Sequence, residues 1–187
     1  TNLVRRAVGF LAYSALAGLQ ALRVGGWLRR VDAVIAMSPP LTLGLTGWFA
    51  ARLRRAPLVF NIQDVFPDAV IDTGALTNRW VIRAAQCLEK LSYRAADVVT
   101  VLSDDLRDNV AAKVPPNRRD RVRVIPNFVD VEAITPSNRL TAYRSELGIG
   151  TGPLVLYAGN VGFSQSLDLL IHAAREMPGV TFLINGD

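Results

Sequence analysis

The feature that most constrains this chain is a regular alternation of short apolar runs with longer helical patterns. The apolar runs lie at residues 33–37, 57–62, 97–102, 122–125, 154–158 and 180–184. Segments with the apolar spacing of a helix lie at 3–24, 41–54, 77–96, 103–113, 140–147 and 166–176. Strands that are apolar on both faces belong to parallel sheets covered by helices. The sequence therefore predicts an α/β fold.

The composition fits a globular protein, with 50% hydrophobic and 20% charged residues among 187. Turn residues gather at 127–150, which we interpret as an interdomain linker. Residues 1–126 are then a first Rossmann-like domain, and 151–187 the start of a second one. The chain begins without methionine and stops just after an apolar run. We therefore expect it to be an internal piece of a longer protein.

The charged residues and the single cysteine limit the kinds of partner and metal site that are expected for this chain. One cysteine, Cys87, excludes a disulfide framework and argues against a metal cluster, so no metal site is expected. The single histidine, His172, falls in an apolar helical stripe and is predicted to be a core residue. A net charge of +5 suits an anionic partner.

The helix predicted at 77–96 carries a basic stripe. Its members are Arg79, Arg83, Gln86, Lys90 and Arg94. A solvated surface is the favoured interpretation, and contact with anionic membrane headgroups is the alternative. Nucleic acid is less favoured, because no aromatic residues interleave with the basic ones.

The turn after the strand at 154–158 is the sharpest candidate binding site. In an open parallel sheet, ligands bind beyond the carboxyl ends of the strands. Gly159 and Gly162 allow a ligand close to the backbone, and the helix expected from Ser166 presents N–H groups to an anion. Ser164 and Gln165 add side-chain hydrogen-bonding groups. The alternative is a tight strand–helix turn with no ligand.

Three other loops follow predicted strands. Asp64 and Asp68 come after the strand at 57–62, where a carboxylate either orients a sugar hydroxyl or takes part in proton transfer, or caps a turn or a short helix. Asn127 and Asp130 either line an interdomain cleft or stabilise a turn, and the turn is favoured. Ser38 opens a Ser-Pro-Pro loop, for which a structural turn is favoured over a binding role.

Five segments occur together in a familiar order. They are SPP at 38–40, NIQDVFPD at 61–68, LEKLSYRAADVV at 88–99, VIPNFVD at 124–130 and LYAGNVGFSQSLDLL at 156–170. Together they resemble glycosyltransferase family 4, which has the GT-B fold, over essentially the whole chain. The branch they most resemble contains bacterial cell-surface polysaccharide enzymes of the WbuB and colanic-acid type.

This resemblance implies a retaining transfer of a sugar from a nucleoside diphosphate, usually UDP, without a cofactor or metal. The acceptor would be a polyprenyl-linked sugar or an oligosaccharide at the cytoplasmic face of the membrane, with the enzyme cytoplasmic or peripheral there. Gly159, Asn160 and Gly162 would lie nearest the donor diphosphate. Gln63 and Asp64 match a position where many relatives carry His-Asp near the reacting sugar.

The sequence also departs from the family pattern. Gln63 replaces a histidine, and Gln165 stands where many relatives have a diphosphate-binding lysine. The family's C-terminal pair of glutamates is absent, so this piece alone is not expected to catalyse. The rival functions are a sugar-nucleotide 2-epimerase of the same fold and a non-enzymatic sugar-binding module. Product analysis separates the first rival from a transferase.

Overall fold

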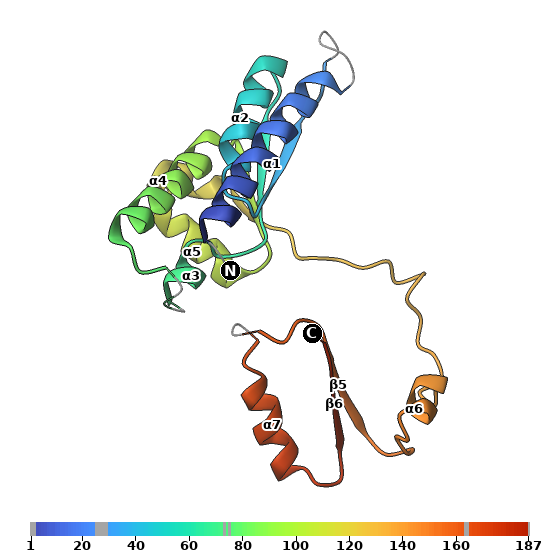
Figure 1. Ribbon diagram of the computed structural model, residues 1–187. Helices are drawn as coiled ribbons and strands as arrows, with labels where there is room; N and C mark the ends of the chain where they lie inside the picture. Colours follow the sequence, from blue (N-terminus) through green and yellow to red (C-terminus); the bar gives the residue numbers. More distant parts are fainter. Residues whose placement is uncertain (1–2, 25–29, 73, 75, 163–164, 187) are drawn as a thin grey trace. The chain divides into compact units, whose positions relative to one another are not determined.

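The computed structural model describes residues 3–24, 30–72, 74, 76–162 and 165–186 (Figure 1). The chain divides into two compact units, Thr1–Phe128 and Val129–Asp187. Each unit contains a parallel β-sheet with helices beside it. The predicted α/β class is therefore confirmed. The assignment of residues 1–126 as an acceptor-side domain and 151–187 as the start of a donor-side domain, which the resemblance to glycosyltransferase family 4 implies, stays a prediction, as does the linker at 127–150.

The first unit is built on a four-stranded parallel sheet in the order β1-β2-β3-β4. The strands are β1 (Val34–Ser38), β2 (Leu58–Ile62), β3 (Val98–Val101) and β4 (Val122–Val124). Because every pair is parallel, all four carboxyl ends lie at one edge of the sheet. This edge carries the predicted site residues of the first unit.

Helices connect these strands. They are α1 (Leu3–Arg23), α2 (Leu43–Arg54), α3 (Asp68–Asp72), α4 (Arg79–Ala95) and α5 (Asp104–Lys113), with the 3₁₀ helix η1 (Pro116–Arg121) before β4. The short helix α3 was predicted as loop, since its five residues are too few to show a helical period. Ser103 caps α5 as the sequence indicates, accepting a hydrogen bond from the Leu106 N–H at 3.3 Å.

The core of the first unit lies on the central strands. Leu58, Phe60 and Ile62 of β2 are at most 1% exposed, and Val101 of β3 is fully buried. The prediction that both faces are covered fails at β1, where Ile35 is 72% exposed. β1 is the edge strand of this sheet, so it has a neighbouring strand on one side only.

Helix α2 packs closely on its neighbours because it contains small residues. It lies beside α1 and contacts both β1 and α4 (Figure 1). An added Cβ at Gly44 would stand 2.5 Å from the Cβ of Ser92 in α4. The helix-to-helix approach therefore depends on the missing side chain at this position.

The second unit is smaller and more open. It contains α6 (Ala142–Glu146), β5 (Leu154–Ala158), α7 (Leu167–Glu176) and β6 (Thr181–Asn185). The two strands pair in parallel, from Leu154 opposite Thr181 to Ala158 opposite Asn185. His172 of α7 is exposed, so its prediction as a core residue is wrong for this chain. A two-stranded sheet beside one helix buries too little surface to cover that side chain.

Candidate functional site

A hydrogen-bonded network joins the carboxyl ends of the first three strands. The backbone N–H of Gln63 donates to the carbonyl of Ser38 at 3.3 Å. The side-chain amide of Gln63 donates to Oδ1 of Asn61, and Asn61 Nδ2 donates to the hydroxyl of Thr100 at 2.9 Å. The network fixes the orientation of Gln63 at the strand edge. Sequence reasoning missed Asn61 and Thr100, although a polar residue inside an apolar strand is a signal for such a contact.

Asp64 follows this network and points to solvent. Its Oδ1 accepts a hydrogen bond from the Val65 N–H at 2.7 Å, and the residue is exposed. The carboxylate stands next to Gln63, and its second oxygen accepts no hydrogen bond from the part of the chain that the structure describes. Ser38 differs, because it is 1% exposed. Its hydroxyl does not line an open surface, and its carbonyl serves the network.

Asp68 lies in a different environment from Asp64. Lys113 Nζ donates to Asp68 Oδ2 at 2.6 Å and to Glu89 Oε1 at 2.7 Å. Asn109 Nδ2 also donates to Asp68 Oδ2 at 3.1 Å, and the Tyr93 hydroxyl donates to Glu89 Oε1 at 3.0 Å. This ion-pair cluster joins α3, α4 and α5. Oδ2 of Asp68 therefore makes a structural contact, and the expected role of this carboxylate in orienting a sugar hydroxyl stays a prediction.

Burial and charge pairing shift the pKa values of the groups in this cluster in opposite directions. Burial raises the pKa of Glu89, and the hydrogen bond from Lys113 only partly opposes this rise. Burial also acts to raise the pKa of Asp68, but hydrogen bonds from Lys113 and Asn109 outweigh it and leave that pKa below its ordinary value. Desolvation would lower the pKa of Lys113, but the hydrogen bonds to Asp68 and Glu89 raise it overall. Lys113 is thus held charged between two carboxyl groups.

In the second unit, the turn after β5 begins with a paired amide. The Gly159 N–H donates to the carbonyl of Asn185 at 3.0 Å and so extends the β5–β6 ladder. Gly159 has φ 157°, and an added Cβ would meet the Tyr157 hydroxyl at 3.2 Å. The Gly159 N–H is therefore already paired within the sheet, and the expectation that Gly159 lies near a donor diphosphate stays a prediction.

The amides that follow Gly159 are available. Among the residues that the structure describes, the N–H groups of Asn160, Val161 and Gly162 donate no hydrogen bond. The carbonyl of Asn160 accepts from the Tyr157 hydroxyl at 2.7 Å, which fixes the peptide at that point. Gln165 closes the turn, because its N–H donates to the carbonyl of Gly162 at 3.1 Å. Ser164 lies outside the described residues.

The start of α7 has one feature that favours anion binding and one that opposes it. Ser166 takes a left-handed conformation, with φ 45°, and makes no side-chain cap. In the described part of the chain, the N–H groups of Leu167 and Asp168 have no hydrogen-bond partner, as at an ordinary helix start. The carboxylate of Asp168 lies in this first turn. It lowers the local positive potential, which the sequence analysis did not weigh.

The residues near the unit boundary form a turn. Asp130 Oδ1 accepts hydrogen bonds from the N–H groups of Glu132 at 3.0 Å and Ala133 at 3.1 Å. This arrangement agrees with the turn that the sequence analysis favoured. Asn127 is exposed. Asn127 belongs to the first unit and Asp130 to the second.

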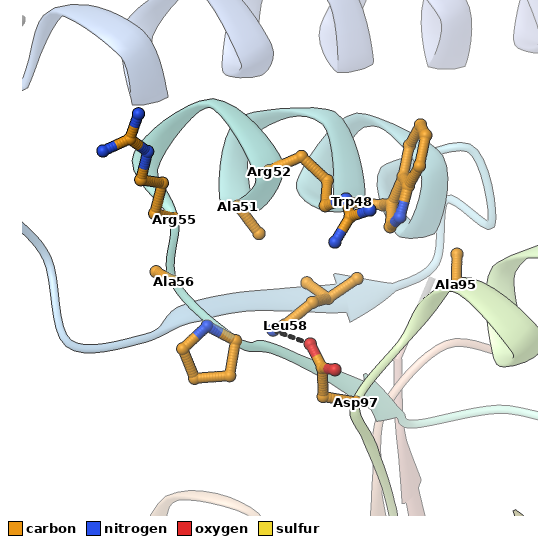
Figure 2. A pocket seen from close by; sticks show the side chains of 9 residues that line it. Trp48, Ala51, Arg52, Arg55, Ala56, Leu58, Ala95 and Asp97 are labelled. Atoms are coloured by element: carbon orange, nitrogen blue, oxygen red, sulfur yellow. Dashed lines mark hydrogen bonds between the residues drawn. The ribbon is translucent and has the colours of Figure 1, made fainter.

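A cavity of 420 Å³ opens at the opposite edge of the first sheet. Figure 2 shows Arg52 of α2 and Arg55, which directly follows that helix, on one side of the cavity and Asp97 on the other. Asp97 accepts a hydrogen bond from the Leu58 N–H at 2.8 Å. Leu58 is the first residue of β2, so the cavity faces the amino ends of the strands. It is therefore separate from the network at Gln63.

Two further properties bear on the function. In the described ranges, no three His, Cys, Asp or Glu side chains come together as metal ligands would. None of the helices described is both long and apolar enough to cross a bilayer.

Comparisons with known proteins add to this geometry. The family described as "Glycosyl transferase 4-like domain" matches residues 2–127. D-inositol 3-phosphate glycosyltransferase of Xylanimonas cellulosilytica is 27% identical over 176 residues, which are 85% of this chain and 38% of that protein. Alpha-galactosylglucosyldiacylglycerol synthase of Streptococcus pneumoniae is 33% identical over 96 residues, covering 50% of this chain and 25% of that protein.

A solved structure has the same fold. The crystal structure of Anabaena Alr3699/HepE in complex with UDP-glucose superimposes with a TM-score of 0.63 at 20% identity, covering 91% of this chain and 42% of that chain. This likeness confirms the expected GT-B fold. The chain spans less than half the length of these relatives.

Proposed function

Because the chain belongs to the glycosyl transferase 4-like family, we propose that its parent protein moves a sugar from a nucleoside diphosphate to an acceptor, with retention of anomeric configuration. The observation that carries this proposal is the turn after β5. Three successive N–H groups, from Asn160 to Gly162, are unpaired among the described residues and precede a helix start. Such a group of amides suits a diphosphate, whose negative charge grows as the sugar leaves.

The proposed donor is a UDP-sugar. In support, the structurally similar Anabaena protein has been solved with UDP-glucose. Asn160 and Gly162 would contribute backbone amides to the diphosphate, with Ser164 and Gln165 beside them. Gly159 would act indirectly, because its missing side chain leaves room for the Tyr157 hydroxyl that holds the carbonyl of Asn160. No cofactor or metal is part of the proposal.

Asp64 and Gln63 are the proposed reactive-site pair of the first unit. Gln63 is held by Asn61 and Ser38, so its side chain is fixed before substrate binds. Asp64 is exposed beside it and would orient a hydroxyl or take up a proton. Ser38 and Asn127 would contribute to the shape of this region through their backbone, and Asp130 would hold the turn at the start of the second unit.

The proposed acceptor is a lipid-linked or oligosaccharide sugar in cell-surface glycan synthesis. In support, the similar Streptococcus pneumoniae protein is named for a glycosylated diacylglycerol product. We further propose that the parent protein works in the cytoplasm, in peripheral contact with the inner face of the cytoplasmic membrane.

The test uses the full-length parent protein with UDP-sugars and two substitutions. We expect Asp64→Asn to lower turnover about 10²-fold or more with donor affinity unchanged, since general acid–base groups contribute on that scale. We expect Gly162→Val to weaken donor binding, because an added Cβ already lies 2.8 Å from Gln165 Oε1. Asp104→Asn, an exposed carboxylate at the start of α5, is the control.

Product analysis accompanies these measurements. Free UDP with a transferred sugar supports the transferase, whereas an isomerised sugar nucleotide would indicate the epimerase. Parent-like behaviour of both variants would mean that the site assignment is wrong.

A further inference from the structure

Helix α4 turns its one acidic residue inward and its cations outward. Glu89 is 1% exposed and pairs with Lys113 of α5. The opposite side of the helix carries four exposed cations with no acidic residue among them. These cations are Arg79, Arg83, Lys90 and Arg94. At 100° per residue they fall within one narrow arc of the helix, so their charges add.

The α4 cations make no ion pair with the residues that the structure describes. The ion pairs found there involve Arg107 and Lys113 and none of the four α4 cations. Arg83, Lys90 and Arg94 line a shallow hollow of 270 Å³ together with Cys87 and Leu91. Arg118 of η1 lies next to the C-terminal end of α4 and donates to the carbonyl of Arg94 at 2.5 Å. This surface therefore holds positive charge that no described carboxylate neutralises.

An exposed tryptophan sits within the same surface. Trp80 is 65% exposed, and the guanidinium groups of Arg79 and Arg83 lie 5.3 and 5.4 Å from its ring centroid. An aromatic ring therefore lies among the cations, and the expectation that none interleaves with them is wrong. Leu91, 47% exposed, adds an apolar side chain.

This combination matches the chemistry of a bilayer surface. Cations attract anionic headgroups, while tryptophan prefers the boundary between headgroups and acyl chains. A helix with one cationic side, an indole and an inward apolar side that is already packed on the protein would lie flat against lipid. A nucleic acid would need several stacked aromatic residues, whereas α4 presents one exposed ring.

We infer that the outer surface of α4 is a docking site for a bilayer that contains anionic lipid. We call it the α4 basic face, and it consists of Arg79, Trp80, Arg83, Cys87, Lys90, Leu91 and Arg94. The inference rests on the proposed function only in that a lipid-linked acceptor has to be reached at a membrane. Docking would hold the first unit at the bilayer whatever sugar is transferred.

The experiment measures sedimentation of the full-length protein with vesicles, without donor or acceptor. One vesicle is phosphatidylcholine alone, and the other is phosphatidylcholine mixed with phosphatidylglycerol. We expect binding only to the mixed vesicles, with an affinity that falls as salt rises. The double variant Arg83→Gln, Lys90→Gln should bind about 25-fold more weakly, at about five-fold for each cation near an anionic surface.

Two controls isolate the surface. Arg139→Gln with Arg175→Gln removes the same charge from the second unit, and it should bind like the parent protein. Trp80→Ser should weaken binding at high salt as well as at low salt, because its contribution is not a charge interaction. A polarity-sensitive dye on Cys87, with Cys87→Ser as the unlabelled reference, should report a less polar environment when mixed vesicles are added.

Several outcomes would overturn the inference. They are equal binding to both kinds of vesicle, an equal loss of vesicle affinity in the two double variants, or a dye on Cys87 whose signal does not change when mixed vesicles are added. Because no sugar nucleotide is present, these outcomes would leave the proposed transfer reaction standing. Loss of transfer with intact vesicle binding would overturn the proposed function instead.

Discussion

A Cβ atom added to Gly186 would collide with the backbone carbonyl oxygen of Gly159. Gly159 directly follows β5 and Gly186 directly follows β6. The hydrogen bond from the Gly159 N–H to the Asn185 carbonyl, at 3.0 Å, holds the two strand ends together. The turn proposed to bind the donor therefore starts from a backbone-to-backbone contact.

Substitution of Gly186 by alanine should disturb this contact. The new Cβ would collide with backbone, which cannot move aside as a side chain can, so we expect a loss of about 2 kcal/mol of unfolding free energy. Gly179→Ala is the matched control, since nothing lies within 4 Å of its added Cβ. Chemical denaturation of the full-length protein measures both. Equal effects of the two changes would show that the strand ends are not tightly packed.

The contact between α2 and α4 gives a second prediction. An added Cβ on Gly44 would stand 2.5 Å from the Ser92 Cβ and 3.0 Å from the Phe60 ring. We expect Gly44→Ala to destabilise the protein by about 1–3 kcal/mol through overpacking. Gly9→Ala in α1, where nothing lies within 4 Å, should instead stabilise it by up to about 1 kcal/mol through helix propensity. Thermal unfolding distinguishes the two signs, and a gain at both positions would contradict the packing argument.

The sequence predicts the elements well where the signal is local. The strand at 154–158 agrees residue for residue with β5, because its apolar run is bounded by a proline and a glycine. The cap at Ser103 was also predictable, because a cap depends on neighbouring residues only.

Contacts between distant segments were not predictable. Asp68 and Lys113 are 45 residues apart, and their ion pair exists only because α3 and α5 pack together. In the same way, the paired amide of Gly159 depends on Asn185 in another strand. A post-strand aspartate or glycine looks alike in sequence whether it binds a ligand or completes the fold.

Removal of the Lys113 ammonium should lower the free energy of unfolding more than removal of a surface cation does. Lys113→Met would leave the carboxylate of Glu89, 1% exposed, buried without its cationic partner. We expect a loss of about 3 kcal/mol near neutral pH. Arg107→Met is the control on the same helix, because Arg107 is 41% exposed and pairs with exposed aspartates, and it should destabilise the protein far less. Equal unfolding midpoints for the two variants would contradict this account.

The pH dependence of stability tests the same cluster through Asp68. Its pKa is lowered from 3.8 in the fold, so the folded state binds fewer protons there than the unfolded state does. Its contribution is present above 3.8 and is lost as the pH falls through the folded pKa. We expect Asp68→Asn to destabilise the protein by about 1.5–3 kcal/mol near neutral pH, the range for a hydrogen bond to a charged group, and by almost nothing well below pH 3.8. Denaturant unfolding of parent and variant across acid pH measures the difference, with Asp108→Asn, an aspartate whose side chain is 71% exposed, as the control. A difference that stays constant down to strongly acid pH would mean that the charge of Asp68 does not stabilise the fold.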